Sequence, residues 1–264
     1  MSTSLDAAVS GMVEQQRNLE LISNNLANVN TPGYKRLSVH FQDVLSDAVA
    51  GDNTGGGSGV RTSAATRSFG QGSLTPTGRD LDFAISGDGF FKVKLEDGTS
   101  GYSRDGTFFV GVDGRLTTSN GYVLDPAVTV PLVYSDLKVD GEGNVSVRRP
   151  LTDAEMAALK PGEPRDGKRE TIGQFKLVRF PNPVGLTSVG QSIFVETEAS
   201  QAPIEGTTGV EGMGSVYAGW LESSNVDIAL EMSNLSLASR SYALSFTAFK
   251  TIEEMLRQAG QVTT

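Results

Sequence analysis

The sequence predicts an α+β protein, with a mainly-β central domain between two long terminal helices that pair as a coiled coil. Residues 5–29 and 228–259 each carry a heptad stripe of apolar residues, whereas the chain between them alternates apolar and polar positions around glycine turns. Helices of that length run roughly 35 to 50 Å at 1.5 Å per residue, beyond an ordinary globular helix. Such helices need partners along their whole length, so the pattern predicts a subunit that joins copies of itself.

The N-terminal stripe has the alternating spacing of three and four that is typical of a coiled-coil seam. Its members are Leu5, Ala8, Met12, Gln15, Leu19, Ile22, Leu26 and Val29, with Gln15 the one polar position. We expect the helix to begin at Thr3, whose hydroxyl suits the free amides, with Asp6 favourable to the helix dipole. It should end before a turn at 30–33, where Pro32 disfavours helix and Gly33 accepts a positive φ.

The C-terminal stripe repeats every seven residues, at Ile228, Leu235, Tyr242, Phe249 and Leu256, with Ala238, Ser245, Ile252 and Ala259 three positions after the last four. Glu231 interrupts it. Gln15 and Glu231 either set the register between helices or lie at the edge of the stripe. An antiparallel pair is expected, because the central domain must connect the end of one helix to the start of the other. Packing of each stripe on the protein's own core is the alternative.

The central region reads as strands. Turn dipeptides at 97–98, 105–106, 113–114 and 120–121 recur at spacings of eight, eight and seven and predict a β-meander. Further strands are expected at 137–147, 172–180, 192–196 and 215–221, and residues 148–170 look like an insertion with a short helix at 152–159. The predicted organisation is an N-terminal helix (1–33), an extended linker with a glycine-rich segment at 51–59 (34–70), the β domain (71–224) and a C-terminal helix (225–264).

The amino-acid composition argues against several classes of binding partner and site. The 264 residues carry 22 basic and 31 acidic side chains, for a net charge of about −9, and no basic cluster is longer than a pair apart from Lys168 and Arg169 near Arg165. Nucleic acid and membrane insertion are therefore not expected. Cysteine is absent, which excludes disulfides and thiolate metal sites. No cleaved signal peptide or membrane-spanning stretch is recognisable, so export would use another route.

Catalytic and metal-binding patterns are weak, and we expect no enzyme activity, cofactor or metal. His40 is the single histidine, which excludes a catalytic triad or multi-histidine site. Asp80 and Asp82 share only their residue type with the carboxylate pair of a glycosidase. Residues 140–144 fit a hairpin turn better than a calcium loop. Trp220 with Phe90 and Phe91 reads as core rather than as a carbohydrate platform.

Four segments resemble bacterial flagellar rod and hook proteins, in the family's order and across nearly the whole chain. They are NNLANVNTPGYK at 24–35, which resembles the N-terminal signature, DFAISGDGFF at 82–91, YSRDG at 102–106 and GWLESSNV at 219–226. The similarity is greatest to the distal rod protein. A segment at 45–60 shorter than in distal rod proteins and a longer one at 148–170 leave the proximal rod proteins open. A hook-type subunit has less room for its additional domain.

The resemblance implies a structural axial subunit of the flagellar basal-body rod that polymerises into a hollow helical tube around the export channel and transmits torque. It implies a homo-oligomer, contacts with other rod and hook proteins, entry through the flagellar type III export apparatus and residence in the periplasmic rod. The expected seam residues are Leu5, Met12, Leu19, Ile22, Leu26, Val29, Leu235, Tyr242, Phe249, Ile252 and Leu256, and the motif and turn residues are Asn25, Asn28, Asn30, Pro32 and Gly33. A secreted β-domain adhesin and a cell-wall hydrolase are the remaining alternatives.

Overall fold

The computed structural model describes residues 2–45, 57–62, 65–131, 133–134, 136–150, 168–210 and 212–262. The chain divides into two compact units, each assembled from distant parts of the sequence. Unit 1 contains residues 1–29, 36–68 and 226–264, and unit 2 contains residues 30–35 and 69–225. The expected 152–159 helix and most of the expected glycine-rich segment lie outside the described residues.

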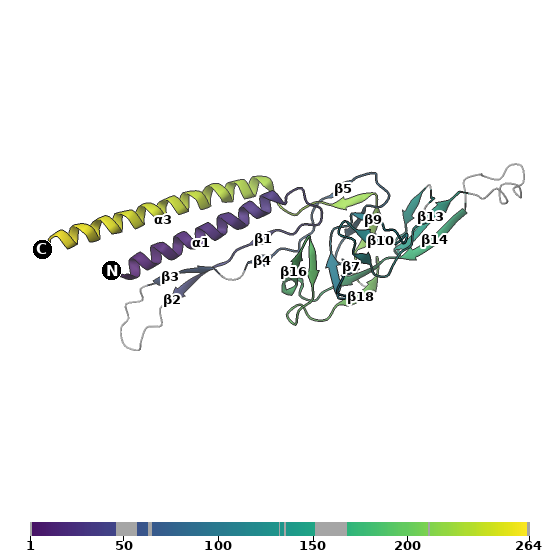
Figure 1. The fold of residues 1–264 in the computed structure, drawn as a ribbon, viewed down its shortest axis with the longest axis horizontal. Helices are drawn as coiled ribbons and strands as arrows, with labels where there is room; N and C mark the ends of the chain where they lie inside the picture. The colour runs from purple at the N-terminus through teal and green to yellow at the C-terminus, as the bar shows by residue number, and fades with distance from the viewer. Residues whose placement is uncertain are drawn as a thin grey trace, which may run out of the picture. The chain divides into compact units, whose positions relative to one another are not determined.

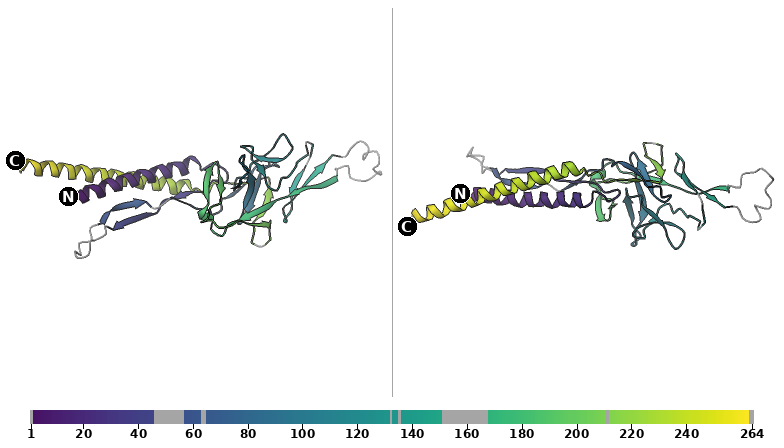
Figure 2. Two further views of the ribbon diagram at one scale, coloured as in Figure 1. Left: turned by 60° about the horizontal axis from the view of Figure 1, so that its bottom comes forward. Right: turned by 90° about the horizontal axis from the view of Figure 1, so that it is seen from above.

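Unit 1 is built on the two terminal helices, α1 (Ser2–Ala27) and α3 (Ile228–Val262). They lie side by side in every view and run antiparallel, with both chain ends at the same end of the pair (Figures 1 and 2). A Cβ on Gly11 would lie 3.9 Å from Ser245 Oγ, which agrees with that direction. The two expected helices are confirmed, and so is their antiparallel packing. Neither, over its described residues, has an apolar stretch suited to crossing a membrane.

The helix starts differ in one detail from expectation. Because α1 begins at Ser2, Thr3 lies inside the helix rather than ahead of it. The cap of α3 is Asp227, whose Oδ1 accepts from the amides of Ala229 at 2.8 Å and Leu230 at 3.2 Å. This cap holds the first turn of α3 in place.

Two short ribbons complete unit 1. In the first, β1 (Leu37–Ser38) pairs antiparallel with β4 (Thr66–Arg67), and in the second β2 (Phe41–Leu45) pairs with β3 (Gly57–Thr62). Gly57 and Gly59, which composition assigned to a flexible segment, therefore belong to a paired strand. Glycine-rich composition favours a linker only where no partner strand supplies backbone hydrogen bonds.

Unit 2 is centred on a nine-stranded sheet of β7 (Phe90–Lys94), β8 (Ser100–Ser103), β9 (Phe108–Val110), β10 (Leu116–Thr118), β11 (Val123–Leu124), β15 (Lys176–Arg179), β16 (Thr187–Gly190), β17 (Ile193–Val195) and β18 (Ile204–Thr207). A single 3-10 turn, η1 (Pro183–Gly185), precedes β16. The main path runs β16-β17-β8-β7-β11-β10-β9, and β15 joins β7 to β18. A mainly-β central region is thus confirmed.

The expected simple meander is wrong at one of its four turns. Gly98, Gly114 and Gly121 have φ of 83°, 74° and 85° and close hairpins, whereas Gly106 closes none. β9 is not a neighbour of β8, because β11 returns to pair with β7. Position 106 requires a glycine for a different reason, because a Cβ there would lie 1.6 Å from the carbonyl oxygen of Phe83. Glycine in a strand region often marks such a close backbone approach.

Smaller sheets surround the main one. β12 (Leu137–Val139), β13 (Asn144–Arg149) and β14 (Lys168–Gln174) form a three-stranded sheet, so the expected strand at 137–147 is a hairpin. β6 (Phe83–Ser86) pairs with β19 (Ser215–Ala218), and β5 (Leu74–Pro76) pairs with β20 (Trp220–Glu222). The core of unit 2 gathers Phe83, Ile85, Phe91, Phe108, Phe175 and Leu177. Trp220 is 38% exposed, so its expected place in the core is wrong.

Candidate assembly site

The predicted seam residues differ in how far their side chains are buried. On α1, Ile22 is buried, and Met12, Leu19 and Leu26 are half-buried. On α3, Ala238 is buried, and Leu235, Phe249 and Ile252 are half-buried. Tyr242 is 37% exposed and Ile228 is 53% exposed, so the stripe reaches the surface at these positions. The side chains of Leu5 and Leu256 lie outside the described set, and Val29 is half-buried after the end of α1.

Glu231 interrupts the apolar stripe because it forms an ion pair inside unit 1. Its side chain is 1% exposed, and its Oε1 accepts from the Nε of Arg36. Its other oxygen, Oε2, is buried without a hydrogen-bond partner in the described part of the chain. Glu231 lines a cavity of about 300 Å³ with Asn18, Asn25 and Asn234. Glu231 therefore links α3 to Arg36, the residue just before β1, and is not an edge residue of the stripe.

Asn25 supplies a second link within unit 1. Its buried side chain donates from Nδ2 to the carbonyl oxygen of Leu37 at 2.8 Å and accepts from the amide of Leu37 at 2.9 Å. This pair of bonds reproduces what a neighbouring strand would offer, and it holds β1 against α1. Asn28 donates from Nδ2 to the carbonyl oxygen of Asn24 at 2.9 Å in the last turn of α1. Asn30 is exposed, and Gly33 adopts φ of 66° at the turn.

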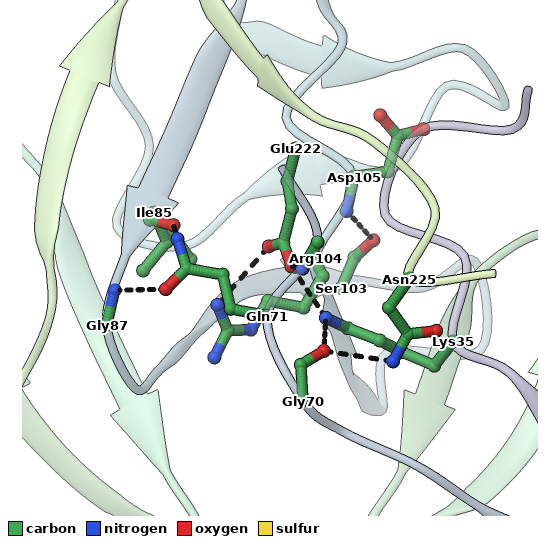
Figure 3. Close-up of polar contacts among 11 residues, drawn as sticks. Lys35, Gly70, Gln71, Ile85, Gly87, Ser103, Arg104, Asp105, Glu222 and Asn225 are labelled. Carbon is green, nitrogen blue, oxygen red and sulfur yellow. Dashed lines mark hydrogen bonds and ion pairs between the residues drawn. The ribbon is translucent and has the colours of Figure 1, made fainter. Parts of the chain in front are cut away.

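Unit 2 holds a buried charge cluster where its separate segments meet (Figure 3). Lys35 Nζ donates to Glu222 Oε1 at 2.6 Å, and Arg104 Nη1 lies 3.3 Å from Glu222 Oε2. The side chains of Lys35 and Glu222 are fully buried, and that of Arg104 is 4% exposed. One carboxylate therefore serves two cations. Burial lowers the pKa of Lys35 and of Arg104, against the attraction of Glu222.

Backbone groups complete this cluster. Lys35 Nζ also donates to the carbonyl oxygen of Gly70 at 2.9 Å, which accepts a further bond from Asn225 Nδ2 at 3.0 Å (Figure 3). The amide of Gly72 donates to Glu222 Oε1 at 2.9 Å, and the amide of Gly33 donates to the carbonyl oxygen of Glu222 at 2.8 Å. The three stretches at which the chain enters or leaves unit 2 are thereby bonded to one another.

The residues of this cluster come from sequence segments that looked independent. Lys35 ends the segment at 24–35, Arg104 lies in 102–106, and Glu222 with Asn225 lies in 219–226. Sequence reasoning singled out these segments but missed the ion pairs among them, because Lys35 and Glu222 are 187 positions apart. The signal that the sequence offered is that each of these three motifs contains a charged residue.

The readings of catalytic and metal sites find no support in the described residues. No group of three or more histidine or acidic residues that would hold a metal is found there. Asp82 is buried and pairs with Arg79 at 3.1 Å, and His40 is exposed. In the 140–144 turn, Asp140 accepts from the amides of Glu142 and Asn144, so it closes the β12–β13 hairpin as expected. Phe90 and Phe91 are buried and do not join Trp220 in an exposed platform.

The chain combines a pair of terminal helices in one unit with a β unit closed by buried charges. Three family models match the chain: flagella basal body rod protein over 5–35, flagellar hook protein FlgE/F/G D1 domain over 84–147 and flagellar basal body rod FlgEFG protein C-terminal over 217–262. The chain is 38% identical to the flagellar basal-body rod protein FlgG of Borreliella burgdorferi, with 99% of each chain covered. It is 34% identical to FlgG of Buchnera aphidicola over 99% of this chain and 100% of that protein.

The chain therefore belongs to the flagellar basal-body rod protein family. The expected resemblance, and its direction toward the distal rod protein, is confirmed by these full-length relatives. A hook protein FlgE of Helicobacter mustelae is 39% identical, but over 47% of this chain and 30% of that protein. Members of this family are structural, so the chain is a structural component of the flagellar basal body and not an enzyme.

Proposed function

We propose that this chain is the distal rod subunit and that it polymerises into a hollow helical tube that encloses the export channel and transmits torque. Copies of itself, other rod and hook proteins and the flagellar export apparatus are its partners. It resides in the periplasmic rod, which it reaches through the flagellar export apparatus. The name FlgG on the relatives that align along the full chain supports the distal position.

The observation that carries self-assembly is a second apolar stripe on α3. Leu230, Leu237 and Leu244 are seven residues apart and are 47%, 58% and 71% exposed, although α3 already lies beside α1. Met232 and Phe246 add further exposed apolar surface. A helix that is apolar on a partnered and on an unpartnered face requires a further partner.

The terminal helices form a coiled-coil layer in this proposal, with Leu5, Met12, Leu19, Ile22, Leu26, Val29, Leu235, Tyr242, Phe249, Ile252 and Leu256 in the seam. The turn residues Asn25, Asn28, Asn30, Pro32 and Gly33 fix where α1 ends and the next strand begins. The domain organisation of 1–33, 34–70, 71–224 and 225–264 belongs to the same proposal. Burial of about 25 cal/mol per Å² along the stripes favours assembly.

The test compares a charge in the second stripe with the same charge elsewhere. Leu244→Glu should abolish rods in negative-stain microscopy at concentrations where the unmodified chain forms them, because a buried unpaired carboxylate opposes the contact. Val189→Glu is the matched control, since Val189 is 61% exposed on the β16–β17 hairpin of unit 2. Circular dichroism should show both variants folded. Rods from Leu244→Glu equal to those of the control would count against the stripe as an assembly surface.

A further inference from the structure

Unit 2 carries a concave site, the arginine pocket, that the helix-based assembly does not use. Its walls come from Phe69, the start of β7, the end of β15 and the start of β18, and it has a volume of about 430 Å³. That volume falls within the range of pockets that hold a ligand. Aromatic and aliphatic side chains with two arginines line it: Phe69, Phe90, Phe180, Ile204, Arg104 and Arg179.

The lining of the arginine pocket contains two basic residues and one acidic residue. Arg104 lies over the ring of Phe90, 5.2 Å from its centroid, and its buried Nε has no hydrogen-bond partner in the described part of the chain. Glu222, its ion-pair partner, is shared with Lys35. Arg179 forms no ion pair among the described residues. Asp88 is the one acidic residue of the lining. An apolar group with an adjacent carboxylate is the occupant that this chemistry recognises.

The same unit presents such a group as a protrusion, the valine knob, formed by Val110, Val112 and Asp113 at the tip of the β9–β10 hairpin. Val112 is 107% exposed and Val110 is 36% exposed. The tip is a closed turn, because the amide of Gly111 donates to the carbonyl oxygen of Arg115 at 2.8 Å and that of Gly114 to Gly111 at 2.9 Å. A β-branched apolar residue fully exposed on an ordered turn contributes nothing to its own fold.

We propose that the valine knob of one copy docks in the arginine pocket of the next, with Val112 against the phenylalanines and Asp113 on Arg179. This proposal rests on self-assembly, as argued above, and adds a second contact made by unit 2. β10 and β11 separate β9 from β7 in the sheet, so knob and pocket occupy different positions of one unit. A contact between two different surfaces is head-to-tail, and it propagates into an open helix when its rotation does not close.

The absence of cysteine from the chain permits a direct test. Full-length Val112→Cys and Ile204→Cys chains are mixed under assembly conditions, oxidised and run on a non-reducing gel. A disulfide-linked dimer should form in the mixture and not from either chain alone, and a chain carrying both changes should give a ladder of multimers. Val189→Cys mixed with Ile204→Cys is the control, because Val189 is exposed on another hairpin of unit 2.

Charge exchange gives an independent readout. Asp113→Lys and Arg179→Glu should each raise the concentration needed for assembly about tenfold, and the double variant should restore it, because each single change places like charges together. Asp113 is on an exposed turn, so its substitution leaves the fold intact. The docking contact alone is overturned if the unmodified chain assembles, the cysteine pair cross-links no more than the control pair, and the double charge variant does not restore assembly. Failure of the unmodified chain to assemble overturns the proposed function and this contact together.

Discussion

At the scale of single residues, Glu222 is the side chain on which most of the buried charge depends. It pairs with Lys35 and Arg104, and it accepts the amide of Gly72. Desolvation of buried ions offsets much of their attraction, so such a cluster is weak grounds for high stability. Removing the shared carboxylate is different, because it leaves two buried cations uncompensated.

Glu222→Gln should therefore lower the free energy of unfolding of unit 2 by about 3–5 kcal/mol. Trp220 is the single tryptophan and lies in β20 beside position 222, so its fluorescence in a urea titration reports this unit. Glu205→Gln is the control: it removes an ion pair with Lys92 that is about half exposed, which should cost less than about 1 kcal/mol. Equal losses from the two variants would contradict the special role of Glu222.

Gly106 tests the close approach of two backbone segments. Gly106→Ala places a Cβ 1.6 Å from the carbonyl oxygen of Phe83, so the strand must shift. We expect a loss of about 3 kcal/mol or more in the free energy of unfolding, at the upper end of overpacking effects. Gly141→Ala, where nothing lies within 4 Å, should leave the urea midpoint nearly unchanged. A tolerated Gly106→Ala would show that this backbone contact is not required.

At the scale of elements, the β12–β13 hairpin depends on a carboxylate at its turn. Hydrogen bonds from Asn144 lower the pKa of Asp140 below its usual value. The folded state then binds this proton less readily than the unfolded chain does, so the stabilisation is present above the usual pKa, near 3.8, and is lost as pH falls through the folded pKa.

The difference in stability between the unmodified chain and Asp140→Ala should accordingly be largest at neutral pH and should shrink below about pH 4. Amide hydrogen exchange of Glu142 and Asn144, whose amides donate to Asp140, measures this difference in stability at the turn itself. Asp113→Ala serves as a control on another hairpin, because Asp113 is an exposed residue in the β9–β10 turn. A difference in stability that does not change with pH would refute the stabilising role of the Asp140 carboxylate.

Local sequence signals predicted elements well where one residue decides the conformation. Gly98, Gly114 and Gly121 close hairpins because a positive φ is a property of the turn itself. The Asp-Gly dipeptide at 105–106 is identical to those at 97–98 and 113–114, but its glycine allows a close contact with Phe83, and nothing nearby in the sequence distinguishes the two uses. The ion pairs of Glu222 and of Glu231 with Arg36 likewise join distant positions, so pattern reasoning found the motifs but not their pairing.

At the scale of the whole molecule, the proposed helix seam and the large aromatic core belong to different units. The seam of α1 and α3 and the second stripe of α3 lie in unit 1, whereas the large aromatic core and the Glu222 cluster lie in unit 2. We therefore expect changes in the helices to act on assembly and to leave the unfolding of unit 2 unaltered, because the effects of substitutions at independent sites add.

The double variant Leu19→Ala with Phe249→Ala should block rod formation, because each change removes a half-buried seam side chain and costs about 1–2 kcal/mol in unit 1, less than full burial would. The urea midpoint reported by Trp220 should stay within error of the unmodified chain, because that residue belongs to unit 2. Val133→Ala with Val189→Ala is the matched control, since it truncates two exposed side chains of unit 2 and should still assemble. Rods formed by the seam variant at unchanged concentration would refute the seam, whereas lost rods with an early Trp220 transition would show that the helices stabilise the β unit instead.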